Sequence, residues 1–275
     1  MYSTALFPVF TARVDEPASG TFVKFDGNHY ILTAGHVWEE FERRRVNGIG
    51  LTLREGVSHR YAPRRSVFIP FILSHPKKWS RWGPDLALLR VPREIVPTIE
   101  AYKAFYDLRK TRIAPPLKAK LRNVDLTTAA EMLSQEKAFL VEIAAIMGTP
   151  RDLGVFSSQH AEVKITALLV DYRGKRRLNG KLDYIDFRVK VSSPAPISDF
   201  RGMSGGGLWR LLIRRSAEGK DEVLGKSLQG VAFFQTRAKN GCSTICCHGL
   251  RSIRALMASA GRRRRHAKVN NLVVS

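Results

Sequence analysis

The chain has 275 residues, of which 44% are hydrophobic, and it carries 46 lysines and arginines against 24 aspartates and glutamates. A chain of this length and apolar content is not disordered, because it can bury a full core in one or two domains. The net charge of +22 raises the question of an anionic partner, such as nucleic acid or an acidic membrane surface. The composition therefore indicates a folded, basic protein.

Short runs of β-branched and aromatic residues separated by turn residues dominate the chain, and this spacing is typical of a sandwich or a barrel. Three stretches instead have a helical period: residues 37–45, residues 126–138, and residues 253–260, after which Gly261 provides a stop. The sequence thus predicts an all-β protein with a few short helices. Strands are expected over residues 20–25, 30–33, 67–73, 85–91, 139–146, 163–171, 184–191, 207–213 and 230–235.

Cys242, Cys246 and Cys247 are the only cysteines, and an odd number so close together argues against a disulfide framework and for a reducing compartment. Their spacing with His248 is not a usual zinc pattern, and adjacent cysteines in a strand point to opposite faces. Buried structural cysteines and no metal are therefore expected. The start of the chain lacks a basic leader, and no segment has the apolar length of a membrane span. We expect a soluble cytoplasmic protein with no membrane contact.

Three local sequences carry residues suited to catalysis. They are Ile31-Leu32-Thr33-Ala34-Gly35-His36-Val37, Gly83-Pro84-Asp85-Leu86-Ala87-Leu88-Leu89-Arg90-Val91 and Phe200-Arg201-Gly202-Met203-Ser204-Gly205-Gly206-Gly207-Leu208-Trp209. A serine hydroxyl becomes a good nucleophile when a histidine takes its proton, and a carboxylate can fix the tautomer of that histidine. Glycines around a serine allow tight turns and expose backbone N–H groups that can face an oxyanion. The remaining histidines show no convincing pairing: His29, His59, His75, His160, His248 and His266.

In this order and at separations of 49 and 119 residues, the three segments resemble the trypsin and chymotrypsin family of serine proteases. The resemblance implies two packed antiparallel six-stranded barrels with an active site between them. It implies His36 as general base and acid, Asp85 as its orienting partner and Ser204 as nucleophile. The N–H groups of Gly202 and Ser204 would form the oxyanion hole.

The resemblance also covers the segment from Leu228 to Gln235, which is similar to the strand that holds the substrate backbone in the family. Phe233, Phe234 and Gln235 stand where the family has a smaller residue, an aromatic and a glycine, so the shape of the specificity pocket is open. The pocket floor would lie near Ser198, with a one-residue shift to the acidic Asp199 as the alternative.

Two departures from the family concern activation and disulfides. Secreted members have an aspartate just before the nucleophile, which pairs with the N-terminus created by cleavage, and here that position is Met203. Activation by N-terminal cleavage is therefore not expected, and the site would be assembled as synthesised or by a partner. Val37 replaces the cysteine that usually follows the histidine, in agreement with a protein free of disulfides.

The sequence as a whole predicts a single trypsin-like peptidase domain, a serine endopeptidase that needs no cofactor and acts on protein or peptide substrates. Its expected parts are an N-terminal barrel (1–106), a linker with a helix (107–138), a C-terminal barrel (139–248), a C-terminal helix (249–261) and a basic tail (262–275). The alternative is a catalytically inactive protease fold that serves as a binding module. The basic charge makes nucleic-acid binding without sequence preference an open expectation in either case.

Overall fold

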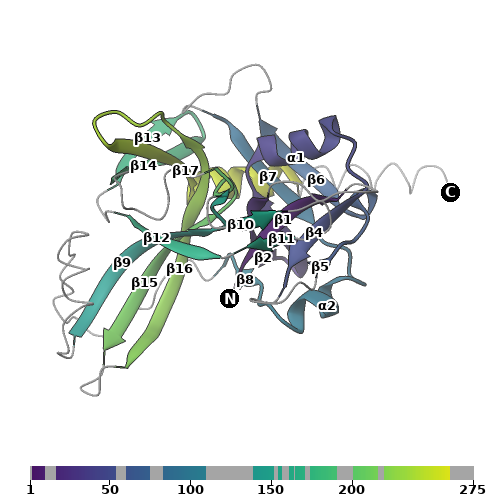
Figure 1. Ribbon diagram of the computed structural model, residues 1–275, viewed down its shortest axis with the longest axis horizontal. Helices are drawn as coiled ribbons and strands as arrows, with labels where there is room; N and C mark the ends of the chain where they lie inside the picture. The colour runs from purple at the N-terminus through teal and green to yellow at the C-terminus, as the bar shows by residue number, and fades with distance from the viewer. Residues whose placement is uncertain are drawn as a thin grey trace.

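The chain folds mainly into β-strands, in a computed structural model that holds two antiparallel sheets and a helix at the C-terminal side (Figure 1). No helix in the described part of the chain is long and apolar enough to cross a membrane. The structure describes residues 2–9, 17–53, 60–74, 83–109, 139–151, 154–156, 161–163, 165–170, 174–190, 201–215 and 220–260.

The first sheet has the strand order β5-β4-β1-β2-β3-β7-β6, and β8 pairs in parallel with β2. The tight turn between β2 and β3 consists of Asp26 and Gly27, whose φ angles of 45° and 68° match the right-handed twist of a two-residue hairpin. The strands are β1 (Ser3–Val9), β2 (Ala18–Phe25), β3 (Asn28–Thr33), β4 (Gly48–Thr52), β5 (Arg60–Tyr61), β6 (Ile69–Ser74), β7 (Asp85–Arg90) and β8 (Tyr106–Asp107).

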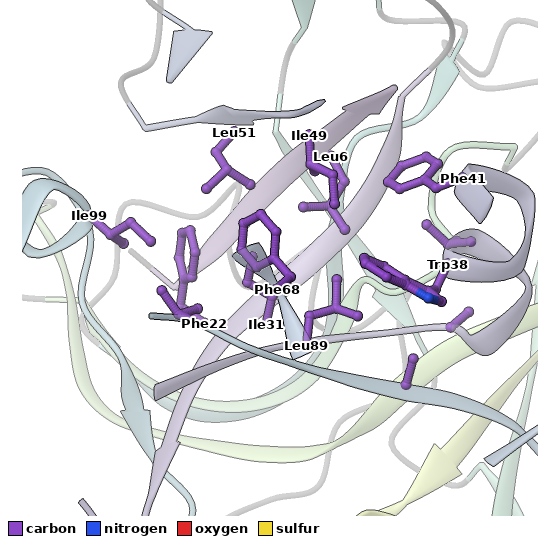
Figure 2. Close-up of a cluster of buried hydrophobic side chains, with 14 of the residues drawn as sticks. Leu6, Phe22, Ile31, Trp38, Phe41, Ile49, Leu51, Phe68, Leu89 and Ile99 are labelled. Atoms are coloured by element: carbon purple, nitrogen blue, oxygen red, sulfur yellow. The ribbon is translucent and has the colours of Figure 1, made fainter. Parts of the chain in front are cut away.

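The helix α1 (Gly35–Arg43) follows β3 directly and buries Val37, Trp38 and Phe41 along one face. These side chains pack into the core of the first sheet, which Figure 2 shows with Phe22, Ile31 and Leu89 among others. Each large apolar side chain buried there stabilises the fold by about 1.5–3 kcal/mol. This packing fixes the start of α1, and therefore His36, against the end of β3. The other short helices are the 3₁₀ turn η1 (Arg65–Val67) and α2 (Val96–Glu100).

The second sheet has the strand order β12-β9-β15-β16-β17-β14-β13, and β10 and β11 form a separate two-stranded sheet. In Figure 1 the far ends of β9, β15 and β16 extend away from the rest of the molecule. The strands are β9 (Phe139–Gly148), β10 (Gly154–Phe156), β11 (Ala161–Val163), β12 (Thr166–Val170), β13 (Lys175–Asn179), β14 (Leu182–Lys190), β15 (Gly207–Arg215), β16 (Asp221–Gln235) and β17 (Cys242–Gly249).

The two sheets share a hydrophobic cluster with the helix of residues 250–260. Trp209 of β15 stacks on Tyr2 at 5.2 Å between ring centroids and meets the ring of Tyr106 edge-on at 5.1 Å. The helix adds Ile253 and Leu256 to the same cluster. The relative position of the two sheets, on which the site depends, is thus held by buried apolar contacts.

The expected all-β class and the C-terminal helix are confirmed. The strand order of each sheet runs from one edge strand to another, so the two six-stranded barrels stay a prediction. The helix expected over residues 37–45 spans Gly35–Arg43, and it ends earlier than expected because Arg45 has a left-handed φ of 51°. The helix expected over residues 126–138 lies outside the described residues.

Candidate active site

His36 and Asp85 form a hydrogen-bonded pair at one end of the first sheet. The histidine lies in the first turn of α1, just beyond β3, and the aspartate is the first residue of β7, which pairs with β3. The Nδ1 atom of His36 is 2.6 Å from Oδ2 of Asp85, and the backbone N–H of His36 donates to Oδ1 at 2.7 Å. Because a carboxylate only accepts, the proton lies on Nδ1, which leaves the lone pair of Nε2 to accept another proton.

A second histidine, His248, forms a hydrogen bond with the backbone of the same aspartate. His248 of β17 is fully buried, and its Nε2 accepts a hydrogen bond from the backbone N–H of Asp85 at 3.0 Å. Its ring stacks on Phe233 at 4.4 Å, and burial lowers the pKa of His248 to about 4, so the ring is neutral near pH 7. Gly83 passes close by, where a Cβ would lie 3.2 Å from Nε2 of His248.

The sequence expectation that the other histidines lack a partner is therefore wrong for His248. Strand β17 alternates along the chain, so Cys246 and His248 share one face and Cys247 takes the other. That alternation identifies an inward-facing histidine but not its contact with Asp85, which lies 163 positions earlier in the chain. Only the packing of β17 against the start of β7 creates the contact.

Ser204 lies in a tight turn that is pressed against the first sheet. Gly202 and Gly205 have φ angles of 87° and 91°, which side chains rarely adopt. A Cβ on Gly205 would lie 1.9 Å from the carbonyl oxygen of Ser19 and 2.2 Å from Oγ1 of Thr33. Because Thr33 precedes His36 by three residues, the structure brings the serine turn to the same end of β3 as the histidine.

The backbone of this turn is oriented by hydrogen bonds to its carbonyl oxygens. A trans peptide points its N–H opposite to the preceding C=O, so the N–H groups of Gly202 and Ser204 face away from the groups that bind the carbonyls of residues 201 and 203. Among the described residues, neither N–H donates to a backbone carbonyl. The carbonyls of residues 201 to 204 accept, in order, from Arg151 N (2.8 Å), Ser19 Oγ (2.6 Å), Gly206 N (2.8 Å) and Ser19 N (2.9 Å).

The strand expected to hold the substrate backbone lies directly beside the serine turn. Ala232 of β16 accepts a hydrogen bond from Gly205 N at 2.8 Å and donates to the carbonyl of Gly206 at 2.9 Å. A register irregularity follows between Ala232 and Phe234, and the side chain of Phe233 is buried against His248.

Phe234 and Gln235, which follow Phe233, are half-buried. Ser198 and Asp199, expected at the pocket floor, lie outside the described residues.

All three cysteines are free thiols, and Cys246 and Cys247 are buried in different hydrophobic clusters, as their alternation predicted. Burial raises the pKa of the Cys247 thiol, so it carries no reactive thiolate. Within the described residues, no group of three His, Cys, Asp or Glu side chains gathers where a metal ion could bind.

Comparisons with known proteins give structural likeness alone, and the one named below is distant. No family model matches the chain, and no curated protein matches it either. Among solved structures, the chain is similar to the protease Anisep from Arthrobacter nicotinovorans, with 9% sequence identity and a TM-score of 0.37, over 89% of this chain and 88% of that one. At this distance the likeness assigns no function, and the chemistry has to come from the residues themselves.

Proposed function

We propose that the chain is a serine endopeptidase whose two sheets form the two barrels of a trypsin-like fold. The observation that carries the proposal is the Nδ1 to Oδ2 hydrogen bond between His36 and Asp85 at the end of β3, where the turn of Ser204 also docks. A histidine oriented by a carboxylate next to a serine in a glycine-rich turn is the arrangement that activates a hydroxyl for attack on an acyl group.

In the proposed reaction, Ser204 Oγ attacks the carbonyl carbon of a peptide bond while Nε2 of His36 takes the hydroxyl proton. Asp85 stabilises the imidazolium that results, and the N–H groups of Gly202 and Ser204 bind the oxyanion of the tetrahedral intermediate. The C–N bond then breaks, and His36 gives its proton to the leaving amine. Water, deprotonated by His36, attacks the acyl-enzyme, and the C–O bond to Ser204 then breaks while His36 returns the proton to Ser204 Oγ, which releases the carboxylic acid and free Ser204.

The proposal includes a site that is assembled without activation cleavage. Met203 stands before the nucleophile and is 2% exposed, so this position offers a buried apolar side chain and no charge for a new N-terminus. The turn is held instead by neutral hydrogen bonds from the folded chain itself.

A fluorophosphonate probe tests the proposal, because it forms a covalent adduct only with a serine hydroxyl activated in this way. We expect the wild-type protein to be labelled at one residue, identified by mass spectrometry as Ser204, and the Ser204→Ala variant to remain unlabelled. Ser259→Ala is the matched control, since the Ser259 hydroxyl donates to the carbonyl of Leu256 within its own helix. This variant should be labelled like wild type.

If folded wild-type protein is not labelled, either alone or with candidate protein partners, this result would contradict the proposed peptidase activity. It would favour the alternative, an inactive binding module. Circular dichroism and thermal unfolding on the same samples establish that each protein is folded. Cleavage of a peptide library by the labelled enzyme then gives the residue preferred before the cut.

A further inference from the structure

Ser19 of β2 uses every polar atom it has to join three separate parts of the chain. The residue is fully buried. Its backbone N–H donates to the carbonyl of Ser204 at 2.9 Å, and its hydroxyl donates to the carbonyl of Gly202 at 2.6 Å. The same hydroxyl oxygen accepts from the N–H of Thr149 at 2.9 Å, and the Ser19 carbonyl accepts from Oγ1 of Thr33 at 2.8 Å.

These contacts reach both residues that supply the proposed oxyanion hole. The hydrogen bond to Gly202 holds the peptide that follows Gly202, and the one to Ser204 holds the peptide that follows Ser204. Each N–H donor therefore belongs to a residue whose other peptide is anchored to the first sheet. Thr149, just beyond β9, keeps the hydroxyl of Ser19 in place by donating to it.

The turn needs such an anchor because its backbone is held in a conformation that few residues adopt. Two of its glycines have φ near 90°, and an ion pair from the position before the nucleophile is excluded by the buried Met203. The peptide after Gly202 lies between the two peptides that carry the Gly202 and Ser204 N–H groups, so its rotation would displace both donors. An unmade hydrogen bond at a buried carbonyl is costly, so the Ser19 hydroxyl opposes that rotation.

We propose that Ser19 is a positioning residue for the hydrolysis: through the carbonyls of Gly202 and Ser204 it holds the peptides that adjoin those carrying the Gly202 and Ser204 N–H groups. This inference rests on the proposed function. Ser19 belongs to the first sheet, whereas the turn that carries the oxyanion hole leads into the second sheet. The geometry of the hole would therefore depend on a contact between the two sheets that forms when the chain folds.

The test compares Ser19→Ala with Thr21→Val. Thr21 lies on the same face of β2 and is equally buried, and its hydroxyl has no hydrogen-bond partner among the described residues. Sites are titrated with the fluorophosphonate, and kcat per titrated site, KM for a peptide substrate and affinity for a peptide boronate are then measured. A boronate forms a tetrahedral adduct on the serine, so its affinity reports on the oxyanion hole.

For Ser19→Ala we expect kcat per site to fall about 10- to 100-fold, boronate affinity to fall by a similar factor and KM to stay within about twofold, because only the transition state uses the hole. Thr21→Val should match wild type in all three. A purely structural role would lower the number of titratable sites and leave kcat per site unchanged, and that result overturns the inference. If the alanine variant does not fold, Ser19→Cys takes its place, because a thiol of similar size forms a much weaker hydrogen bond than the hydroxyl. A wild-type kcat per site in that variant overturns the inference too. Wild-type protein that takes no label overturns the proposed function and this inference together.

Discussion

Three hydrogen bonds to two histidines define the orientation of Asp85. Its carboxylate accepts from the ring and the backbone N–H of His36, and its own N–H donates to His248. The hydrogen bond from Asp85 requires Nε2 of His248 to be free of a proton, so it exists only while His248 is neutral. The orientation of the proposed triad is therefore linked to the protonation of a buried histidine outside it.

At this scale we predict that His248 makes the protein less stable in acid. Its folded-state pKa of about 4 lies below the ordinary 6.5, so the unfolded chain binds the proton first as the pH falls. Stability is therefore lost between about pH 6.5 and pH 4, by about 3 kcal/mol from this group. The groups that face it are Asp85 and Asp183, which both favour the charged ring, but burial has the larger effect.

Urea unfolding at pH 7 and pH 4.5 checks this prediction on wild type and His248→Gln. Glutamine can still accept from the Asp85 N–H but does not titrate, so the difference in unfolding free energy between the two pH values should be smaller by about 2–3 kcal/mol in the variant. Equal differences in both proteins would show that His248 does not titrate as described.

At the scale of the elements, the conformation of the turn from Arg201 to Gly206 is set by close contact with its neighbours. Gly205 has no room for a side chain, because the carbonyl of Ser19 and the hydroxyl of Thr33 lie where a Cβ would be. The turn therefore docks on β2 and β3 through its bare backbone. This contact places the serine at the end of the strand that leads to His36.

We predict that Gly205→Ala abolishes activity and destabilises the protein by more than backbone strain alone. The matched control is Gly27→Ala, since Gly27 also has a positive φ of 68° but no atom within 4 Å of the position that a Cβ would take. The control should cost about 1–2 kcal/mol and leave kcat unchanged. Thermal unfolding and kcat per titrated site measure both effects. Activity in Gly205→Ala similar to that of Gly27→Ala would mean that the turn does not need this contact.

The whole molecule is held together by a core that both sheets and the C-terminal helix share, around Trp209. The chain carries 46 lysines and arginines against 24 aspartates and glutamates, and several of the described acidic side chains are paired with arginine. Because basic residues outnumber acidic ones, lysines and arginines remain in excess after each acidic side chain is paired with one of them. The described pairs include Glu40 with Arg43, Glu42 with Arg65, Asp107 with Arg109, Asp186 with Arg177, Glu142 with Arg210, and Glu222 with Arg214.

At the scale of the whole protein we predict binding to nucleic acid by charge alone. A labelled polyuridine and a mixed-sequence DNA should bind with similar affinity at about 50 mM salt, and affinity should fall by about 10³-fold or more at about 200 mM if six or more phosphates are contacted. Fluorescence anisotropy measures both. Ser204→Ala should bind like wild type, because the surface charge is unchanged. Absence of binding at the lowest salt would end this prediction.

The local pattern of residues determined the β-rich class, the helix after His36 and the three segments that carry the proposed triad. These features depend on periodicity and on short-range chemistry, which a sequence displays directly. The pairing of His36 with Asp85 was predictable as well, because a family resemblance connected residues that are 49 positions apart.

Only the tertiary structure decided that His248 supports Asp85, that Phe233 faces the core rather than a ligand, and that Ser19 holds the turn of Ser204. A serine or a histidine inside a strand looks ordinary in a sequence. Its partners are set by which strands pack together and by which buried polar groups must then find one another. Hydrogen bonds between residues more than 100 positions apart arise from that packing, so they become visible only when the two sheets are placed side by side.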